Sequence, residues 1–148
     1  MTPDLLALSR AVVALPGAPK PPQYARSYRA DNGVAWVPTW AACPECDGTG
    51  YVDVPGTDSG ESACFADCHR GQIEIAVLDL TDDATAGVML SALPFAVKVV
   101  TRTEPRAYRL MWLEEDGEGL GPRQHSTQWC DSLGEAVARV MVARGRYA

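Results

Sequence analysis

The chain has 148 residues, 47% of them hydrophobic and 22% charged, which suits one folded domain and excludes wholesale disorder. Its formal net charge of -6 argues against broad, non-specific binding to nucleic acid or to anionic membranes. No apolar run approaches the length of about 18 residues that a membrane-spanning helix needs, so we expect no membrane association.

The first 40 residues predict a helix, a linker and a β-hairpin. Thr2 and Pro3 suit a helix cap and the first helical position, and apolar side chains recur with helical spacing over residues 5–15. A proline-rich linker follows, and residues 24–38 predict a β-hairpin around an Asn32-Gly33 turn. Trp36 and Trp40 are interpreted as apolar anchors that pack in the core.

Nearly all of the acidity lies in the centre of the chain. Residues 31–85 contain eleven acidic side chains and one basic side chain, Arg70, while the two flanking segments are slightly basic. One interpretation is a solvated acidic surface. The other is an acidic patch that repels nucleic acid and prefers a protein partner with a basic surface.

The same central segment holds four of the five cysteines, and these predict a metal site. Cys43, Cys46, Cys64 and Cys68 follow the pattern C-x2-C-x17-C-x3-C, close to the usual spacing of structural zinc sites. Four thiolates leave no open coordination position, so we expect one structural Zn²⁺. His69 is an alternative fourth ligand, because it follows Cys64 with C-x4-H spacing.

A catalytic Cys43–Cys46 dithiol is the competing interpretation of the first pair. It fits poorly, because a redox C-x-x-C normally opens a helix, whereas glycines follow here. The N-terminus also lacks the basic region of a secretory signal, so we expect a cytoplasmic location, where thiols stay reduced.

The cysteine segment resembles the zinc region of DnaJ-type chaperones, whose repeat is C-x-x-C-x-G-x-G. One full repeat is matched by Cys43, Cys46, Gly48 and Gly50, and a second is matched loosely by Cys64, Cys68 and Gly71. The resemblance covers about thirty residues and implies zinc binding. The chain contains no His-Pro-Asp motif of a J-domain, so chaperone recruitment is not implied.

The second half of the chain predicts alternating helices and strands. Residues 72–78 are extended, and a helix begins at Thr81 or Asp82 and ends at Pro94. Strands are expected around residues 95–99 and 108–112, a mobile loop over 114–127, and a last helix capped by Ser132 and ended by Gly145.

Together these elements predict a small two-layer α+β domain whose C-terminal half is α-β-β-α. We expect residues 1–40 and 76–148 to form the main domain, and residues 41–75 to form an inserted zinc knuckle.

A longer resemblance concerns small uncharacterised phage and prophage proteins. The phrase LDLTDDATAGVMLSAL at residues 78–93 is similar to a recurrent DLTDPATLGCLLALV phrase in those proteins, although Asp83 replaces their usual proline. Their first and last helices are echoed by residues 2–15 and 132–143. The resemblance implies an origin in a mobile element and a host cytoplasm as location, but no activity.

No catalytic constellation emerges from the sequence. A Cys130–His125 pair has no feature that orients it, and the acidic run over residues 114–118 lacks the spacing of a calcium loop. We therefore expect a non-enzymatic accessory protein that binds a protein, as a host-directed regulator or inhibitor. The alternatives are an uncharacterised enzyme and a nucleic-acid-binding zinc module, whose basic surface would be Arg102, Arg106, Arg109, Arg139, Arg144 and Arg146.

Overall fold

The computed structural model describes residues 1–22, 28–29, 33–54, 56, 60–64, 68–115, 119 and 121–148. Within these residues the helices are α1 (Pro3–Val13), α2 (Asp83–Ala92) and α3 (Leu133–Arg144). The strands are β1 (Tyr28–Arg29), β2 (Ala35–Ala42), β3 (Tyr51–Asp53), β4 (Glu61–Ala63), β5 (Gln72–Leu78), β6 (Lys98–Thr103), β7 (Arg106–Glu115) and β8 (Pro122–Ser126).

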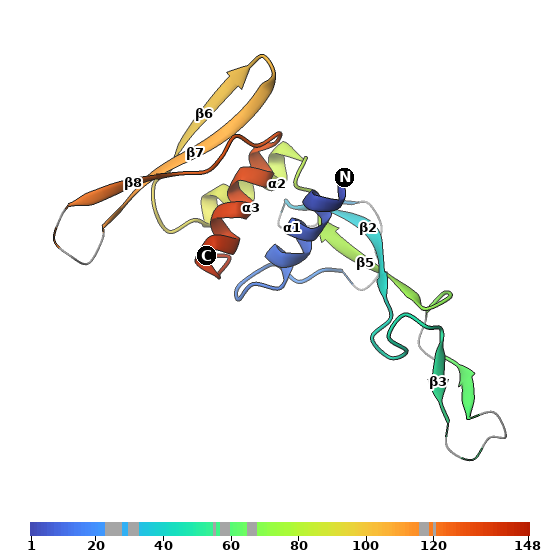
Figure 1. Ribbon diagram of the computed structural model, residues 1–148. Coiled ribbons are helices and arrows are strands. Elements are labelled where there is room, and N and C mark those ends of the chain that lie inside the picture. The colour runs from blue at the N-terminus through green and yellow to red at the C-terminus, as the bar shows by residue number, and fades with distance from the viewer. Residues whose placement is uncertain are drawn as a thin grey trace.

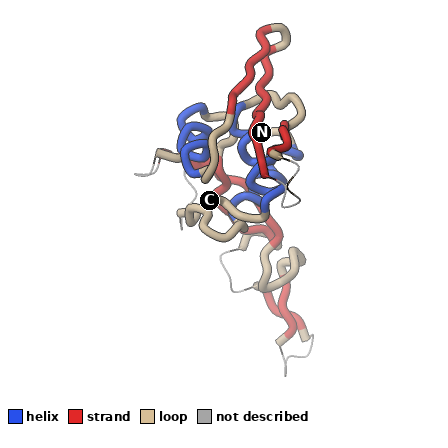
Figure 2. The backbone as a smooth tube through the Cα atoms, turned by 90° about the vertical axis from the view of Figure 1, so that its left-hand side faces the viewer, coloured by secondary structure: helices blue, strands red, loops and turns tan. Residues whose placement is uncertain are grey.

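The strands form three small antiparallel sheets around a helical centre, which confirms the predicted α+β class (Figure 1). Their orders are β1-β2-β5, β3-β4 and β6-β7-β8. The β2–β5 ribbon leads away from the helices and carries the β3–β4 hairpin at its far end, while the β6–β7–β8 sheet projects on another side (Figures 1 and 2). The described helices include none that is long and apolar enough to cross a lipid bilayer.

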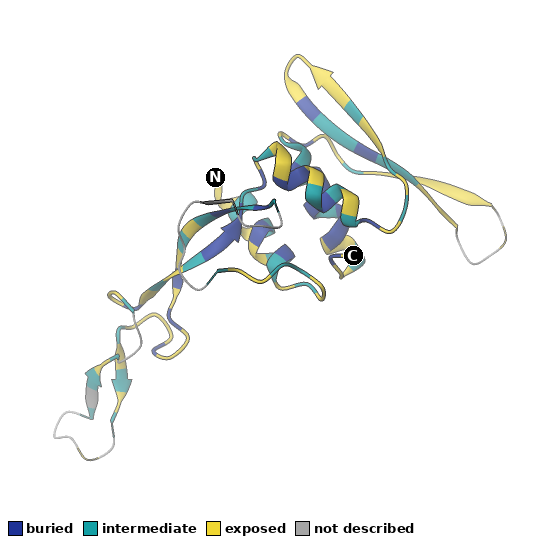
Figure 3. Cartoon of the chain, turned by 180° about the vertical axis from the view of Figure 1, so that it is seen from behind, coloured by how far each residue is buried: buried dark blue, intermediate teal, exposed yellow. Residues whose placement is uncertain are grey.

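The core lies where the three helices meet the inner ends of the strands. Trp36 of β2, Leu78 of β5, Met89 of α2, Leu110 of β7 and Met141 of α3 are all fully buried in one cluster. In Figure 3 the buried residues gather on the helices and at the base of the strands, while the two projecting parts are mostly exposed. The prediction that Trp36 is a core anchor is confirmed.

All three helices begin at the predicted caps. The Thr2 and Asp82 side chains accept hydrogen bonds from the amides of Leu5 and Thr85, three residues downstream. At α3 the Ser132 hydroxyl accepts from the Glu135 amide at 3.1 Å. These side chains satisfy amides that the first helical turn leaves free, which fixes where each helix starts.

Two buried hydroxyl groups tie the helices to the β2–β5 ribbon. Ser9 of α1 donates to the carbonyl of Leu78 in β5 at 2.8 Å, and both groups are buried. Thr85 of α2 accepts from the amide of Ala35 in β2 at 2.7 Å and donates to the Asp82 carboxylate. A buried polar group is costly unless it is paired, so these bonds hold the ribbon in a defined direction relative to the helices.

The predicted pairing of two strands is present, but one of the two tryptophans expected to pack in the core is exposed. β1 pairs antiparallel with β2, while Asn32 of the expected turn lies outside the described residues. Trp40 is 51% exposed, so the prediction that it packs in the core was wrong. Trp36 and Trp40 share a face of β2, but Trp40 lies four residues further out, beyond the reach of the helices.

The prediction of a mobile loop over residues 114–127 was also wrong, because this segment contains the third strand of a sheet. β7 continues to Glu115, and β8 pairs antiparallel with it from Met111 to Glu115. Every side chain of β8 is exposed. A strand without a buried face shows no alternation of apolar and polar residues, so the sequence contains no strand signal there. The C-terminal half is therefore α-β-β-β-α.

Candidate metal centre

Four cysteine side chains converge at the far end of the β2–β5 ribbon. Cys43 directly follows β2, Cys46 lies in the next turn, Cys64 follows β4, and Cys68 precedes β5. Their sulfur atoms all lie within 4.8 Å of one another, which is close enough to hold one metal ion. The structure thus brings together the four cysteines that the spacing singled out.

The distances between the sulfur atoms fit tetrahedral coordination. The Cys43 and Cys64 sulfurs are 3.9 Å apart, and those of Cys46 and Cys68 are 4.0 Å apart. A regular tetrahedron with zinc–sulfur bonds of about 2.3 Å has sulfur–sulfur edges of about 3.8 Å. The donor set and its size therefore suit Zn²⁺.

Backbone hydrogen bonds join the two cysteine pairs to each other. The Cys43 amide donates to the carbonyl of Gly71 at 2.8 Å, and the Cys64 amide donates to the carbonyl of Gly50 at 2.9 Å. The first cysteine of each pair is thus bonded to a glycine that follows the other pair. These reciprocal hydrogen bonds link the two pairs without any metal–ligand bond.

The backbone after each pair folds back toward the sulfur atoms. Gly48 and Gly50 after the first pair, and Arg70 and Gly71 after the second, all have positive φ angles. The Gly50 amide reaches the Cys46 sulfur at 3.2 Å. Such amide donors stabilise thiolates, and four thiolates around Zn²⁺ carry a net charge of -2.

The same contacts set the acidity of the thiols. Burial raises the pKa of Cys46, but the Gly50 amide and the neighbouring thiols outweigh that effect and lower the pKa to about 7. Burial dominates at Cys68 and raises its pKa. Cys46 therefore loses its proton to an incoming metal ion more readily than Cys68 does, because thiolates are the metal-binding form.

Gly71 is the tightest point of the cluster, and its replacement should weaken metal binding. A Cβ atom on Gly71, whose φ is +82°, would overlap the carbonyl oxygen of Gly48. We expect Gly71→Ala to lower zinc affinity by about 10- to 100-fold, the usual effect of disturbing the support of a metal site. Competition with a chromophoric zinc chelator measures this change.

Gly56→Ala is the matched control for that substitution. Gly56 also has a positive φ, of +90°, but no atom of the described residues lies within 4 Å of its added Cβ. Its zinc affinity should equal that of the unmodified protein. Equal affinities for Gly71→Ala and Gly56→Ala would contradict the role given to the close approach at Gly71.

His69 stands next to the cluster but is not a member of it. Its backbone pairs with Gln72 in a short bridge, with hydrogen bonds of 2.7 Å and 3.1 Å. The described group of potential ligands consists of the four cysteines alone. The geometry therefore favours Cys68 over His69 as the fourth ligand.

The other pair considered from the sequence lies outside this cluster. Cys130 is buried beside β7, bonded through its backbone to Tyr108, and burial raises the pKa of its thiol. His125 of β8 instead stacks on Trp112, with ring centroids 5.6 Å apart, and lies 3.6 Å from the Glu114 carboxylate. The structure thus gives each residue partners of its own.

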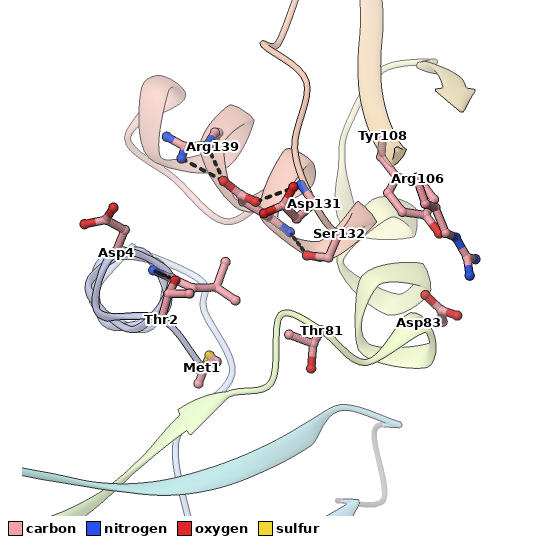
Figure 4. A pocket seen from close by; sticks show the side chains of 12 residues that line it. Met1, Thr2, Asp4, Thr81, Asp83, Arg106, Tyr108, Asp131, Ser132 and Arg139 are labelled. Carbon is pink, nitrogen blue, oxygen red and sulfur yellow. Dashed lines mark hydrogen bonds and ion pairs between the residues drawn. The ribbon is translucent and has the colours of Figure 1, made fainter. Parts of the chain in front are cut away.

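A cavity of about 790 Å³ lies where the first turns of the three helices meet (Figure 4). Four carboxylates and two guanidinium groups line it, and Arg139 donates to Glu135 at 2.8 Å. Each helix places an acidic residue in its first turn here, which offsets the positive end of the helix dipole. Three of the four carboxylates of this cavity are thus explained by their places at helix starts.

The cysteine cluster is the site whose geometry points to a specific ligand. Comparisons with protein-family models, with curated proteins and with solved structures found no match. The assignment of the metal centre therefore rests on the sulfur positions, the supporting amides and the tight glycine contacts.

Proposed function

We propose that this chain is a non-enzymatic protein whose residues 40–74, which we call the finger, are held by one structural zinc ion and bind a basic segment of a partner protein. The observation that carries the proposal is the exposure of Trp40 and Tyr51, which are 51% and 61% accessible on an otherwise acidic finger. Large aromatic side chains left in solvent are typical of binding surfaces.

The need for zinc follows from what the finger lacks. Among its described residues, the buried apolar side chains are those of Ala41, Cys43 and Cys46. So small an apolar interior cannot fix a defined surface, whereas a closed site of four cysteines supplies folding free energy directly. With all four positions taken by thiolates, the ion has a structural role.

The charges on the finger define its partner. Tyr51 lines a hollow of about 490 Å³ together with Glu45, Asp47 and Asp53. Trp40 lies directly opposite Glu74 in the neighbouring strand. A lysine or arginine side chain can meet a carboxylate and an aromatic face at both places, so a basic segment suits this surface.

We further propose that the protein is an accessory protein of a phage or prophage, acting in the host cytoplasm as a regulator or inhibitor of a host protein. The support is the sequence phrase at residues 78–93, which forms the end of β5 and α2. The C-x-x-C-x-G-x-G pattern at Cys43 supports the zinc assignment alone.

Binding of a labelled arginine-rich peptide, followed by fluorescence anisotropy, tests the role of the finger. Trp40→Ala should weaken binding by about tenfold or more, because a central aromatic anchor contributes roughly 2 kcal/mol. Removing two carboxylate charges together, by Glu45→Gln and Glu74→Gln, should also weaken binding and reduce its dependence on salt concentration.

The matched control neutralises two exposed acidic residues elsewhere, Asp4→Asn and Glu115→Gln, which changes the net charge by the same amount. That variant should bind like the unmodified protein. Equal losses in both charge variants, with no loss in Trp40→Ala, would mean that the peptide senses only net charge, and the proposal would be rejected.

A further inference from the structure

The β6–β7–β8 sheet has a face that is opposite in charge to the finger. In the strand register Lys98, Arg102 and Arg109 lie on one side of the sheet. The guanidinium groups of Arg102 and Arg109 both lie over the ring of Trp129, at 5.0 Å and 5.9 Å from its centroid. We call these four residues the arginine face.

The cations of the arginine face have no anionic partner among the residues that the structure describes. In the part of the chain that the structure describes, none of the three forms an ion pair with a carboxylate. The Trp129 ring instead holds two of them in place, so little conformational freedom is lost when an acidic group binds. Glu115, on the same side of β7, lies at the far end of that strand.

Exposed apolar side chains accompany the charges on both surfaces, and they include four of the seven large hydrophobic residues that the structure describes as exposed. Of the large hydrophobic side chains that the structure describes as exposed, Trp40 and Tyr51 lie on the finger. Leu113 and Trp129, which are 63% and 38% exposed, lie on or beside the arginine face. The finger is therefore mainly acidic and the arginine face basic, and each combines its charge with apolar area that a partner could cover.

The two surfaces cannot meet within one molecule. The finger and the β6–β7–β8 sheet project from different sides of the helical centre (Figures 1 and 3). Both are antiparallel ribbons tied to the core, the first of them through the buried Ser9 and Thr85 hydrogen bonds. A contact between them therefore requires two copies of the chain.

We propose that the finger of one copy docks on the arginine face of a second copy. The inference rests on the proposed function, because it names a partner for the same acidic surface. The contact uses different surfaces on the two molecules, so it is heterologous and leaves one finger and one arginine face free at the ends. Association then continues head to tail, and another basic protein that binds the finger competes with it.

The negative net charge of the chain does not prevent this contact. The residues of the finger carry a formal charge of -6, which accounts for the whole net charge of the chain. Charges further apart than about 8 Å are largely screened at physiological ionic strength. Attraction where the two surfaces touch therefore outweighs the repulsion between the remaining parts of the two molecules.

Sedimentation velocity of the zinc-loaded protein at low and high ionic strength tests the proposal. We expect the sedimentation coefficient to rise with protein concentration at low ionic strength and to return to the monomer value at high ionic strength. Lys98→Glu with Arg102→Glu should abolish association, and so should Glu45→Lys with Glu74→Lys. All four positions are exposed, so these variants should fold, which circular dichroism and zinc content verify.

Mixing the two variants gives the decisive result. One variant retains an acidic finger and the other retains a basic arginine face, so mixing them should restore the association that neither variant shows alone. An unmodified protein that stays monomeric at low ionic strength, or a mixture that stays monomeric, would overturn the inference.

The same variants distinguish self-association from the two alternatives, a different protein partner for the finger and a nucleic-acid partner for the arginine face. If the finger binds the arginine-rich peptide but the protein does not self-associate, the proposed function stands and the inference is overturned. If the protein stays monomeric and an oligonucleotide binds it in a way that Lys98→Glu with Arg102→Glu abolishes, the arginine face belongs to nucleic acid and the inference is again overturned.

Discussion

Replacing Cys43 and Cys46 together with serine should reduce the zinc content from about one ion per chain to none and unfold the finger without unfolding the helices. Structural zinc contributes roughly 10–16 kcal/mol of binding free energy in small modules at neutral pH. The described core cluster contains no residue from the finger, so the helices keep their packing. Metal analysis and amide NMR spectra measure the two effects separately.

Single substitutions identify the individual zinc ligands. Cys68→Ser should lower the zinc content and affinity, whereas His69→Ala and Cys130→Ser should each keep about one zinc ion per chain. Loss of zinc in His69→Ala with retention in Cys68→Ser would make His69 the fourth ligand. Zinc retained in the Cys43→Ser, Cys46→Ser double variant would refute the four-cysteine site.

Gly134→Ala should destabilise the whole domain, although it places a better helix former in α3. A Cβ atom on Gly134 would overlap the carbonyl oxygen of Leu80 and lie 2.9 Å from its carbon. The Ser132 hydroxyl bonds to that same carbonyl at 2.7 Å, so the start of α3 cannot move away freely. We expect a loss of about 1–3 kcal/mol in the free energy of unfolding, measured by urea denaturation.

Gly87→Ala in α2 is the opposite case and the control. Gly87 is exposed, and its added Cβ would have no atom within 4 Å in the part of the chain that the structure describes. Alanine in a helix interior is favoured over glycine by about 0.5–1 kcal/mol, so this variant should be more stable. A similar change in stability for both substitutions would show that the contact at Leu80 does not constrain α3.

The helices could be predicted closely because their signals are local. Thr2, Asp82 and Ser132 each cap a helix through bonds to residues three positions downstream, and Gly145 ends α3 with a φ of +69°. At the start of α3 the Glu135 carboxylate also accepts a hydrogen bond from the amide of Asp131. Short-range bonds of this kind leave a readable pattern in the sequence.

The features that the sequence did not reveal depend on tertiary position. β8 is an exposed edge strand, and its place is set by pairing with β7 and by the stacking of His125 on Trp112. Trp40 is exposed because the ribbon carries it away from the helices, which no property of the residue itself indicates. Local patterns cannot distinguish an aromatic side chain in the core from one on a projecting ribbon.

The metal centre lies between these two cases. The cysteine spacing and the glycines at 48 and 50 indicated which residues converge. The reciprocal bonds from Cys43 to Gly71 and from Cys64 to Gly50 join residues that are far apart in the sequence, so they could be seen only in three dimensions. Arg70 adopts a positive φ of 51°, a conformation that is uncommon for arginine and could not be predicted from the residue type.

The register of the β2–β5 ribbon has a consequence for how this protein can change over evolution. Ala42 and Gln72, the outermost pair, lie directly opposite each other where the cysteine-bearing segment begins and ends. A tight turn of about two residues could close the ribbon at that point. Natural recombination could therefore replace the segment between Ala42 and Gln72 with a segment of different binding specificity, while the helical centre stays unaltered.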